Sequence, residues 1–190
     1  MNIIENLNNN NLIYYIKNYD IIPYFEQKNI NSCLSNSLSY AISYILYNHH
    51  HIELEKTVIN PFILHKLAEL LNGTNLNNLI FIINNFDKLK YLVKIDDIIT
   101  KSYFDINMIN DYNIKLEYNK NLLVIKKDFD VIRYYLLNDL PLLITLDVNN
   151  GNHTMNIIGF NNKNKTIILN NNLELGTNEK IIIIYVIIYL

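Results

Sequence analysis

Apolar residues recur at helical spacing in three segments of the first half of the chain. The segments cover residues 33–47, 60–73 and about 77–89. Pro61 stands in the first turn of the second segment, where proline is tolerated, and Gly73 is a typical residue just beyond a helix end. The pattern therefore predicts three helices. Their inward positions are Leu38, Ala41, Ile42, Ile45 and Leu46 in the first, Ile63, Leu64, Leu67, Leu70 and Leu71 in the second, and Leu79, Ile82, Ile83 and Phe86 in the third.

The second half of the chain changes to short β-branched or aromatic runs, separated by segments rich in Asn, Gly and Lys. One helix interrupts these runs: Asp128 or Asp130 is suited to cap its start, and Pro141 ends it. We therefore predict an antiparallel sheet or a partly closed barrel. The predicted strands cover residues 122–125, 142–148, 155–160, 166–169 and 181–189.

The order of these elements predicts the fold class α+β, with an N-terminal helical lobe and a C-terminal β-barrel-like lobe. We expect an N-terminal arm at residues 1–22, the helical lobe at 23–115 and the β-rich lobe at 116–190. Residues 91–118 have an irregular pattern and are expected to cross between the lobes. A functional site is expected in the cleft between the two lobes.

Composition narrows the function classes. The chain has 190 residues, half of them apolar, with 16 basic against 18 acidic residues and a net charge of −2. A nearly neutral chain has no large positive field, which disfavours nucleic-acid and membrane-surface binding. One cysteine allows no internal disulfide, and the N-terminus shows no secretory signal pattern, so a cytoplasmic location is expected. The longest apolar run, 181–190, is too short to span a bilayer.

Cys33 is the only cysteine, and it opens the first predicted helix. Unpaired backbone N–H groups and the helix dipole favour a thiolate at such a position, so Cys33 is a candidate nucleophile. The alternative is that Cys33 is a small buried hydrophobic residue, which is the commoner role of a lone cysteine. The choice between these two roles depends on whether other residues of the chain could form a catalytic site with Cys33.

Three polar residues complete a possible site around Cys33. His153 follows a turn and precedes a strand, so it is expected at a strand's mouth, and a hairpin turning at 161–165 brings Asn170 back beside it. An amide there could orient the imidazole as in a Cys/His/Asn variant of the catalytic triad. The side-chain N–H₂ of Gln27 could join the Cys33 backbone N–H in stabilising an oxyanion.

The other histidines favour structural roles. His49, His50 and His51 are consecutive and cannot all face one point on a regular element, and no acidic or cysteine partner stands at ligand spacing. We expect a solvated helix end there, with a metal site as the alternative. His65 has apolar neighbours on the second helix and is expected to be structural. No metal or cofactor is therefore predicted.

The ordered set Gln27, Cys33, His153 and Asn170 resembles that of the papain-like cysteine peptidases. Further similarity lies in Ser32 before the cysteine, in the strand G-N-H-T-M-N-I-I-G-F, in I-I-L-N, and in the D-F-D-V-I-R-Y-Y-L-L-N-D-L-P-L-L-I-T-L segment. The likeness runs from about residue 23 to the C-terminus, with residues 91–118 unmatched, and is strongest to compact viral and microbial members without a propeptide.

The resemblance implies a papain-like fold and a thiol protease, a hydrolase acting on a polypeptide substrate through an acyl-enzyme. Cys33 would be the nucleophile, His153 the proton donor, Asn170 the group that orients His153, and Gln27 the oxyanion donor. The expected protein is a monomer without cofactor or metal, either cytoplasmic or associated with a virion.

Several positions depart from the family pattern. Leu34 replaces the usual aromatic after the cysteine, Lys28 replaces the glycine next to the glutamine, and the chain has no Trp to shield Asn170. Two alternatives therefore stay open beside a peptidase. One is a catalytically silent papain-like binding module. The other is a related Cys/His acyl-transfer enzyme, such as a peptidase of exporter-associated type or a transamidase, in which Asp more often stands at the position of Asn170.

Overall fold

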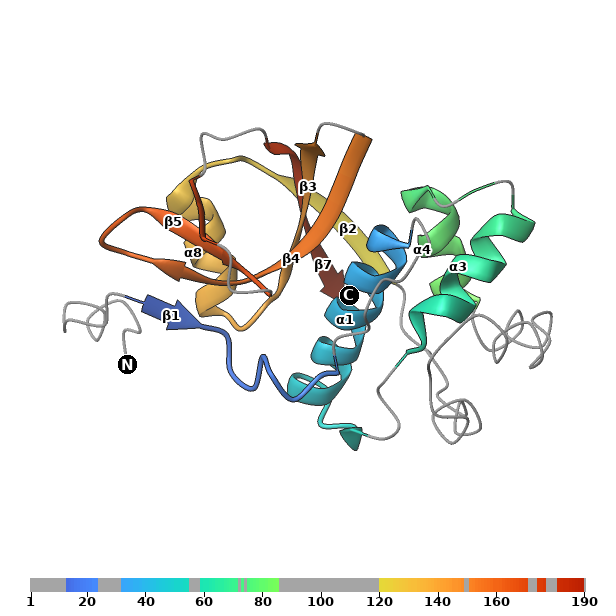
Figure 1. Cartoon of the computed structure of the whole chain (residues 1–190). Helices are drawn as coiled ribbons and strands as arrows, with labels where there is room; N and C mark the ends of the chain where they lie inside the picture. The colour runs from blue at the N-terminus through green and yellow to red at the C-terminus, as the bar shows by residue number, and fades with distance from the viewer. Residues whose placement is uncertain are drawn as a thin grey trace.

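A computed structural model describes residues 13–23, 32–54, 59–71, 73, 75–85, 120–148, 151–170, 174–176 and 181–189. The described helices are α1 (Cys33–Asn48), α3 (Pro61–Leu70), α4 (Leu76–Asn84) and α8 (Phe129–Leu137). The described strands are β1 (Ile13–Tyr15), β2 (Lys120–Ile125), β3 (Leu142–Val148), β4 (Gly151–Asn161), β5 (Thr166–Leu169), β6 (Glu174–Gly176) and β7 (Ile181–Tyr189). Figure 1 shows a curved sheet on one side, α3 and α4 on the other, and α1 between them.

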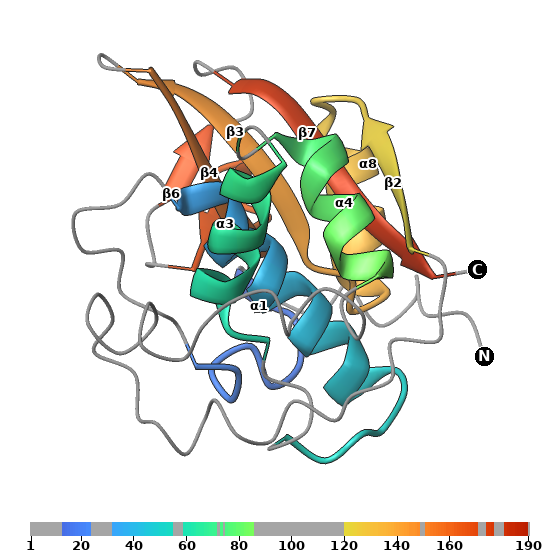
Figure 2. The same ribbon diagram turned by 90° about the vertical axis from the view of Figure 1, so that its right-hand side faces the viewer.

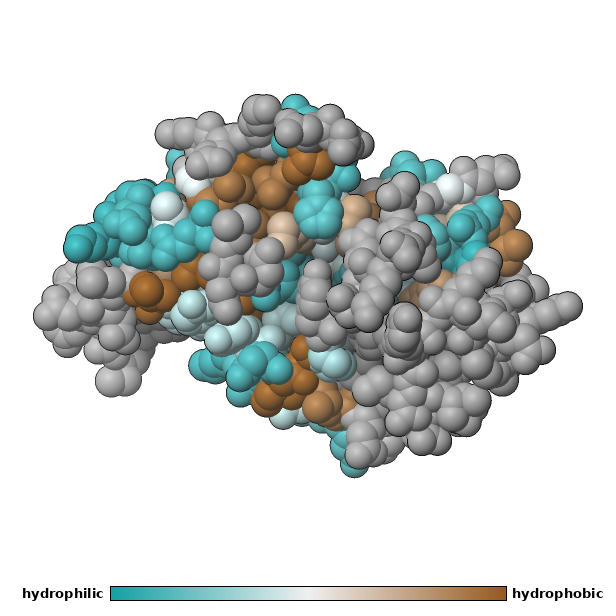
Figure 3. All heavy atoms as spheres, in the orientation of Figure 1, coloured by the Kyte–Doolittle hydropathy of each residue, from teal (hydrophilic) through white to brown (hydrophobic). Residues whose placement is uncertain are grey.

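All described strand pairings are antiparallel, and the strand order is β2-β7-β3-β4-β5-β6, with β1 added to β4. Strands β3 and β4 form a hairpin, as do β4 and β5. In Figure 3 apolar surface gathers over the curved sheet, whereas the polar tip of the β4–β5 hairpin forms a hydrophilic edge. The predictions of an α+β fold class and of an antiparallel sheet are both confirmed.

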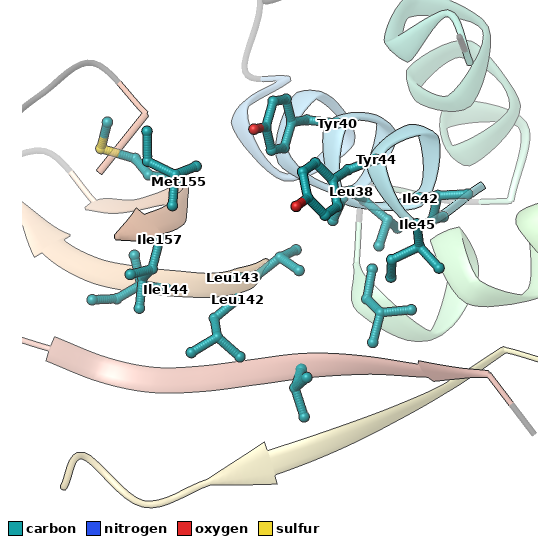
Figure 4. Packing of buried hydrophobic residues seen from close by; sticks show 14 of the residues in the cluster. Leu38, Tyr40, Ile42, Tyr44, Ile45, Leu142, Leu143, Ile144, Met155 and Ile157 are labelled. Carbon is teal, nitrogen blue, oxygen red and sulfur yellow. The ribbon is translucent and has the colours of Figure 1, made fainter. Parts of the chain in front are cut away.

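Helix α1 is the centre of the molecule. It packs against β3 and β4 on one side and against α3 on the other, and every residue from Ser37 to Leu46 is buried. Figure 4 shows apolar side chains of α1 facing Leu142 and Leu143 of β3. The predicted apolar stripe is therefore present but covers only part of the buried surface, because α1 is enclosed by neighbours around its circumference.

Four serines are buried within this apolar helix: Ser35, Ser37, Ser39 and Ser43. Ser39 donates its hydroxyl proton to the Ile59 carbonyl, and Ser43 Oγ accepts from Ile59 N at 3.1 Å. Small hydroxyl side chains let neighbouring backbone approach closely, and a buried hydroxyl is stable only when it is hydrogen bonded. Ser39 and Ser43 thus tie α1 to Ile59, whereas the buried Ser35 hydroxyl has no hydrogen-bond partner among the described residues.

The helices begin as their sequences predict. Asn60 accepts from Phe62 N at 2.8 Å and caps α3, with Pro61 in its first turn. Asp128, rather than Asp130, caps α8 by accepting from Asp130 N and Val131 N. Helix α4 starts at Leu76, one residue before the predicted position, while the predicted end near residue 89 lies outside the described residues.

Figure 2 shows α4 beside β2, which it contacts, so a helix of the first half covers part of the sheet built by the second half. Helix α8 contacts β3 and β4, and the Phe129 ring meets the Phe160 ring edge-on with centroids 5.9 Å apart. Within the ranges described, no helix has the length and apolar character needed to cross a membrane.

Residues 13–22 from the predicted arm are integrated into the body. Strand β1 pairs with residues 159–161 of β4, and the hydroxyls of Tyr40 and Tyr44 on α1 donate to the carbonyls of Tyr19 and Lys17 at 2.7 Å each. This segment joins the end of β4 that lies away from His153. The described part of the arm therefore bridges α1 and the sheet.

Gly159 allows that close approach. A Cβ atom at this position would lie 2.3 Å from the backbone oxygen of Tyr14, which is closer than real Cβ contacts. Any side chain would therefore push β1 away from β4. The glycine is part of a register irregularity between Ile157 and Gly159 where β4 pairs with β5.

Candidate active site

Cys33 is the first residue of α1, where the leading N–H groups of the helix have no partner within the helix. Its thiol is partly buried and hydrogen bonded to the His153 side chain. Burial raises the pKa of the thiol, but the hydrogen bond from His153 and backbone hydrogen bonds from Thr154 and Leu34 hold that pKa below its ordinary value. The charge of the imidazole adds to the effect, so Cys33 tends toward the thiolate.

His153 is the third residue of β4 and pairs with Leu146 of β3. The hydrogen bond to Cys33 raises the pKa of the imidazole, while burial acts in the opposite direction and the thiolate charge adds to the rise. The two pKa changes agree: both favour a thiolate beside an imidazolium. That is the charge state of an activated cysteine nucleophile.

The structure corrects the predicted start of this strand. We expected residues 155–160, with His153 at the mouth, but β4 begins at Gly151 and already includes the histidine. Residues 151–153 have weak strand propensity, yet each pairs with a residue of β3. Cross-strand pairing with β3 thus overrides local sequence preference.

Two buried hydrogen bonds connect α1 to β4 next to this pair. Ser37 Oγ donates to the Thr154 carbonyl at 2.9 Å, and Asn156 Nδ2 donates to the Ser37 carbonyl at 2.9 Å. Thr154 follows His153 directly, and Ser37 lies one helical turn beyond Cys33. Sequence reasoning missed all three residues. The signal that could have found them is the run of serines on a buried helix, since most buried hydroxyls have a hydrogen-bond partner.

Asn170 directly follows β5, and its backbone N–H donates to the Asn156 carbonyl at 3.1 Å. The hairpin thus returns Asn170 to Asn156 of β4, three residues beyond His153. Both polar atoms of the Asn170 side chain are buried and have no hydrogen-bond partner in the described part of the chain. The predicted hydrogen bond between Asn170 and His153 is therefore not formed in this structure, and the orienting role stays a prediction.

Gln27, the predicted oxyanion donor, lies outside the described residues. Its position relative to Cys33 stays a prediction as well. Of the four predicted site residues, the structure brings Cys33 and His153 into contact and places Asn170 against the strand that carries His153.

The remaining histidines lie elsewhere. His49 ends α1, and its Nε2 lies 2.8 Å from the carbonyl of Asp139, while His51 is exposed. His65 is buried on α3, with Nε2 3.3 Å from Glu69 Oε1. Across the described ranges, no group of three or more His, Cys, Asp or Glu side chains could hold a metal ion.

A hollow of about 580 Å³ lies at the C-terminal end of α1 and is lined by Lys17, His49, His51, Glu53 and Asp139, among others. Neither Cys33 nor His153 lines it. The hollow is therefore not the cleft that the sequence predicts, and the location of that cleft stays a prediction.

Comparison with known proteins adds the family. The model of a family described as "Peptidase_C39 like family" matches residues 19–184, which is most of the chain. This protein belongs to the Peptidase_C39-like family. The match spans Cys33, His153 and Asn170 together with the region of Gln27.

The fold is similar to that of xylellain, a cysteine protease from Xylella fastidiosa. The TM-score is 0.65 at 14% sequence identity, and the similarity covers 94% of this chain and 86% of xylellain. No curated protein matches the chain. The family and the fold together confirm the predicted papain-like cysteine peptidase family and fold. Nothing in these matches supports the viral origin that the sequence suggested.

Proposed function

We propose that this member of the Peptidase_C39-like family is a cysteine endopeptidase that hydrolyses polypeptides through a covalent acyl-enzyme. The observation that carries the proposal is the contact between Cys33 and His153, which lowers the pKa of the thiol and raises that of the imidazole. A cysteine that served only as a small buried hydrophobe would need neither a histidine partner nor a position at a helix N-terminus.

The reaction follows from this charge state. The Cys33 thiolate attacks the carbonyl carbon of the scissile peptide bond and forms a C–S bond, while the carbonyl oxygen takes up the negative charge. The His153 imidazolium donates its proton to the amide nitrogen as the C–N bond breaks and the amine leaves. His153, now neutral, takes a proton from water, whose oxygen attacks the thioester. The C–S bond breaks, releasing the carboxylic acid product and restoring the thiolate–imidazolium pair.

Two further residues have roles in this proposal. The side-chain amide of Gln27 and the backbone N–H of Cys33 stabilise the oxyanion, a contribution of about a hundredfold or more in comparable sites. Asn170 accepts the second ring N–H of His153 and fixes the orientation of the imidazole. Since the Asn170 amide is buried without a partner in the described residues, it has an unused acceptor available for that bond.

A second candidate is a catalytically silent binding module with a papain-like fold. The missing hydrogen bond between Asn170 and His153 favours it, because an imidazole without an orienting partner is a poorer acid and base. The perturbed pKa values of Cys33 and His153 favour the peptidase, since a binding surface makes no demand on either charge state.

Hydrolysis of a mixture of unfolded polypeptides tests the proposal. New peptide N-termini, identified by mass spectrometry, should form with the wild-type chain under reducing conditions and be absent with Cys33→Ala. Cys33→Ala keeps the helix start and removes only the sulfur, so equal thermal stability of the two chains is the matching control. If the wild-type chain produces no more cleavage than Cys33→Ala at any pH between about 5 and 9, where a Cys/His pair titrates, the peptidase proposal fails.

A further inference from the structure

Besides their own hydrogen bond, Cys33 and His153 are held together by contacts between the elements that carry them. Cys33 belongs to α1 and His153 to β4, and these elements are joined through Ser37, Thr154 and Asn156. We propose that Asn156 and Ser37 are positioning residues that set the register of α1 on β4 and thereby the alignment of the Cys33 thiol with the His153 imidazole. This inference rests on the proposed function and extends it to residues outside the reacting set.

Sequence spacing places these residues beside the pair. Ser37 follows Cys33 by four residues, so both side chains lie on the same face of α1. The carbonyl of Thr154, the residue right after His153, accepts the Ser37 hydroxyl proton. A shift of α1 along β4 that moved Cys33 away from His153 would therefore break this hydrogen bond as well.

Asn156 supplies the second connection. Its side-chain Nδ2 reaches the carbonyl of Ser37, while its own backbone carbonyl accepts the N–H of Asn170. One residue thus contacts the helix that carries the nucleophile and the residue predicted to orient the histidine. Asn156 is only 1% exposed, so water does not compete for either bond.

The surrounding contacts cannot set this register by themselves. Met155 and Ile157, which flank Asn156, and Leu38, which follows Ser37, are apolar and belong to the core. Apolar contacts are non-directional and tolerate small sliding movements, whereas a hydrogen bond loses strength quickly with distance and angle. The Asn156 amide lies in this apolar interface, and its Oδ1 is buried and unpaired among the described residues. We infer that the interface needs a directional contact, which apolar packing does not provide.

The test measures how fast a small thiol alkylating reagent, iodoacetamide, modifies Cys33 as a function of pH. The variants are Ser37→Ala, which removes the hydroxyl, Ser37→Thr, which keeps it, and Asn156→Leu, which keeps the volume but removes the donor. Ser43→Ala is the matched control, because Ser43 is also buried on α1 but accepts from Ile59 N instead of contacting β4. Thermal unfolding is measured for every variant.

We expect Ser37→Ala and Asn156→Leu to slow alkylation near neutral pH by roughly 10- to 100-fold, the range typical of small misplacements of reacting groups. The midpoint of the pH profile should move up toward that of a free thiol. Ser37→Thr should recover most of the rate. Ser43→Ala should stay within about twofold of wild type even if it unfolds at a similar temperature to Ser37→Ala, since an ordinary buried hydrogen bond is lost in both.

Wild-type rates and midpoints in folded Ser37→Ala and Asn156→Leu would overturn the positioning role, as would an equal slowing in Ser43→Ala. If Asn156→Leu does not fold, the comparison of Ser37→Ala with Ser37→Thr and Ser43→Ala decides. Failure of the proposed function looks different: the wild-type chain itself would then alkylate with the rate and midpoint of a free thiol, and the variants would have no activation to lose.

Discussion

The Cys33 thiol at the start of α1 is hydrogen bonded to the His153 imidazole on β4, and each group shifts the pKa of the other toward the charged form. The contact joins the helical first half of the chain to the sheet of the second half. Attack requires Cys33 without its thiol proton, and release of the amine requires the second ring proton of His153. The activity of the pair therefore depends on pH.

Alkylation and peptide hydrolysis should respond differently to pH. The thiol pKa is lowered, so the thiolate is lost only when the pH falls below that lowered value, and alkylation should reach its plateau at a lower pH than for a free cysteine. The imidazole pKa is raised, so the proton donor is lost when the pH rises above that raised value. Hydrolysis should therefore show a bell-shaped profile, while alkylation rises and then stays high.

The variant His153→Ala separates these effects. Without the imidazole, burial still raises the thiol pKa and only the backbone hydrogen bonds oppose it, so the alkylation midpoint should move up. His51→Ala is the control, because His51 is exposed and lies near the other end of α1. An unchanged midpoint in His153→Ala would show that the histidine does not activate the cysteine.

Asp139 should contribute to stability without contributing to the reaction. Its Oδ1 accepts from Tyr14 OH at 3.2 Å and from Lys17 N at 3.1 Å, which ties β1 and the segment after it to the turn before β3. Asp139→Ala removes both hydrogen bonds and should lower the free energy of unfolding by about 1–3 kcal/mol. The backbone φ of Asp139 is 55°, a value that asparagine tolerates, so Asp139→Asn should lose less.

Urea unfolding measures these losses, and the alkylation rate of Cys33 should stay at the wild-type value in both variants. An Asp139→Ala chain as stable as the wild type would mean that the contacts with Tyr14 and Lys17 do not hold this segment. The exposed ion pair between Lys17 Nζ and Asp139 is expected to add little, since surface ion pairs are weak.

Gly159→Ala should weaken the attachment of β1. Its new Cβ would meet the Tyr14 backbone oxygen at 2.3 Å, and backbone yields less readily than a flexible side chain. We expect a loss of about 1–3 kcal/mol in unfolding free energy, the usual cost of forcing an extra carbon into a packed site. In a chain without residues 1–15 the clash partner is gone, so the same substitution should cost much less. An equal cost in both chains would place the strain elsewhere.

Much of this fold could be predicted because local chemistry and tertiary structure agree. Strands β3, β5 and β7 start and end where their β-branched runs do, and α3 begins at the predicted Asn60-Pro61 cap. The predicted strand boundaries failed where pairing with residues far away in the sequence determines the structure. Strand β4 extends back to Gly151 because β3 pairs with it, and β1 forms in the segment that we assigned to an arm because Gly159 lets it reach the sheet.

In the candidate site, too, residues with a local sequence signal could be predicted, and residues that depend on tertiary contacts could not. Cys33 could be found because a cysteine at a helix start has a chemical consequence, and His153 because the sequence puts it between a turn and an apolar run. The roles of Ser37 and Asn156 could not be found, since they depend on which turn of α1 faces which residue of β4. A helical pattern specifies a buried face but not its register against a sheet formed more than a hundred residues later.

The central claim is that Cys33 forms a covalent acyl-enzyme, and intact-protein mass spectrometry tests it most directly. The wild-type chain, mixed briefly with an activated peptide ester and quenched in acid, should gain the mass of one acyl group, located on Cys33 by fragmentation. The adduct should disappear over time in the wild-type chain as water releases it, and it should be strongly reduced in His153→Ala. A wild-type chain that never carries the acyl group on Cys33, at any quench time, would contradict the claim.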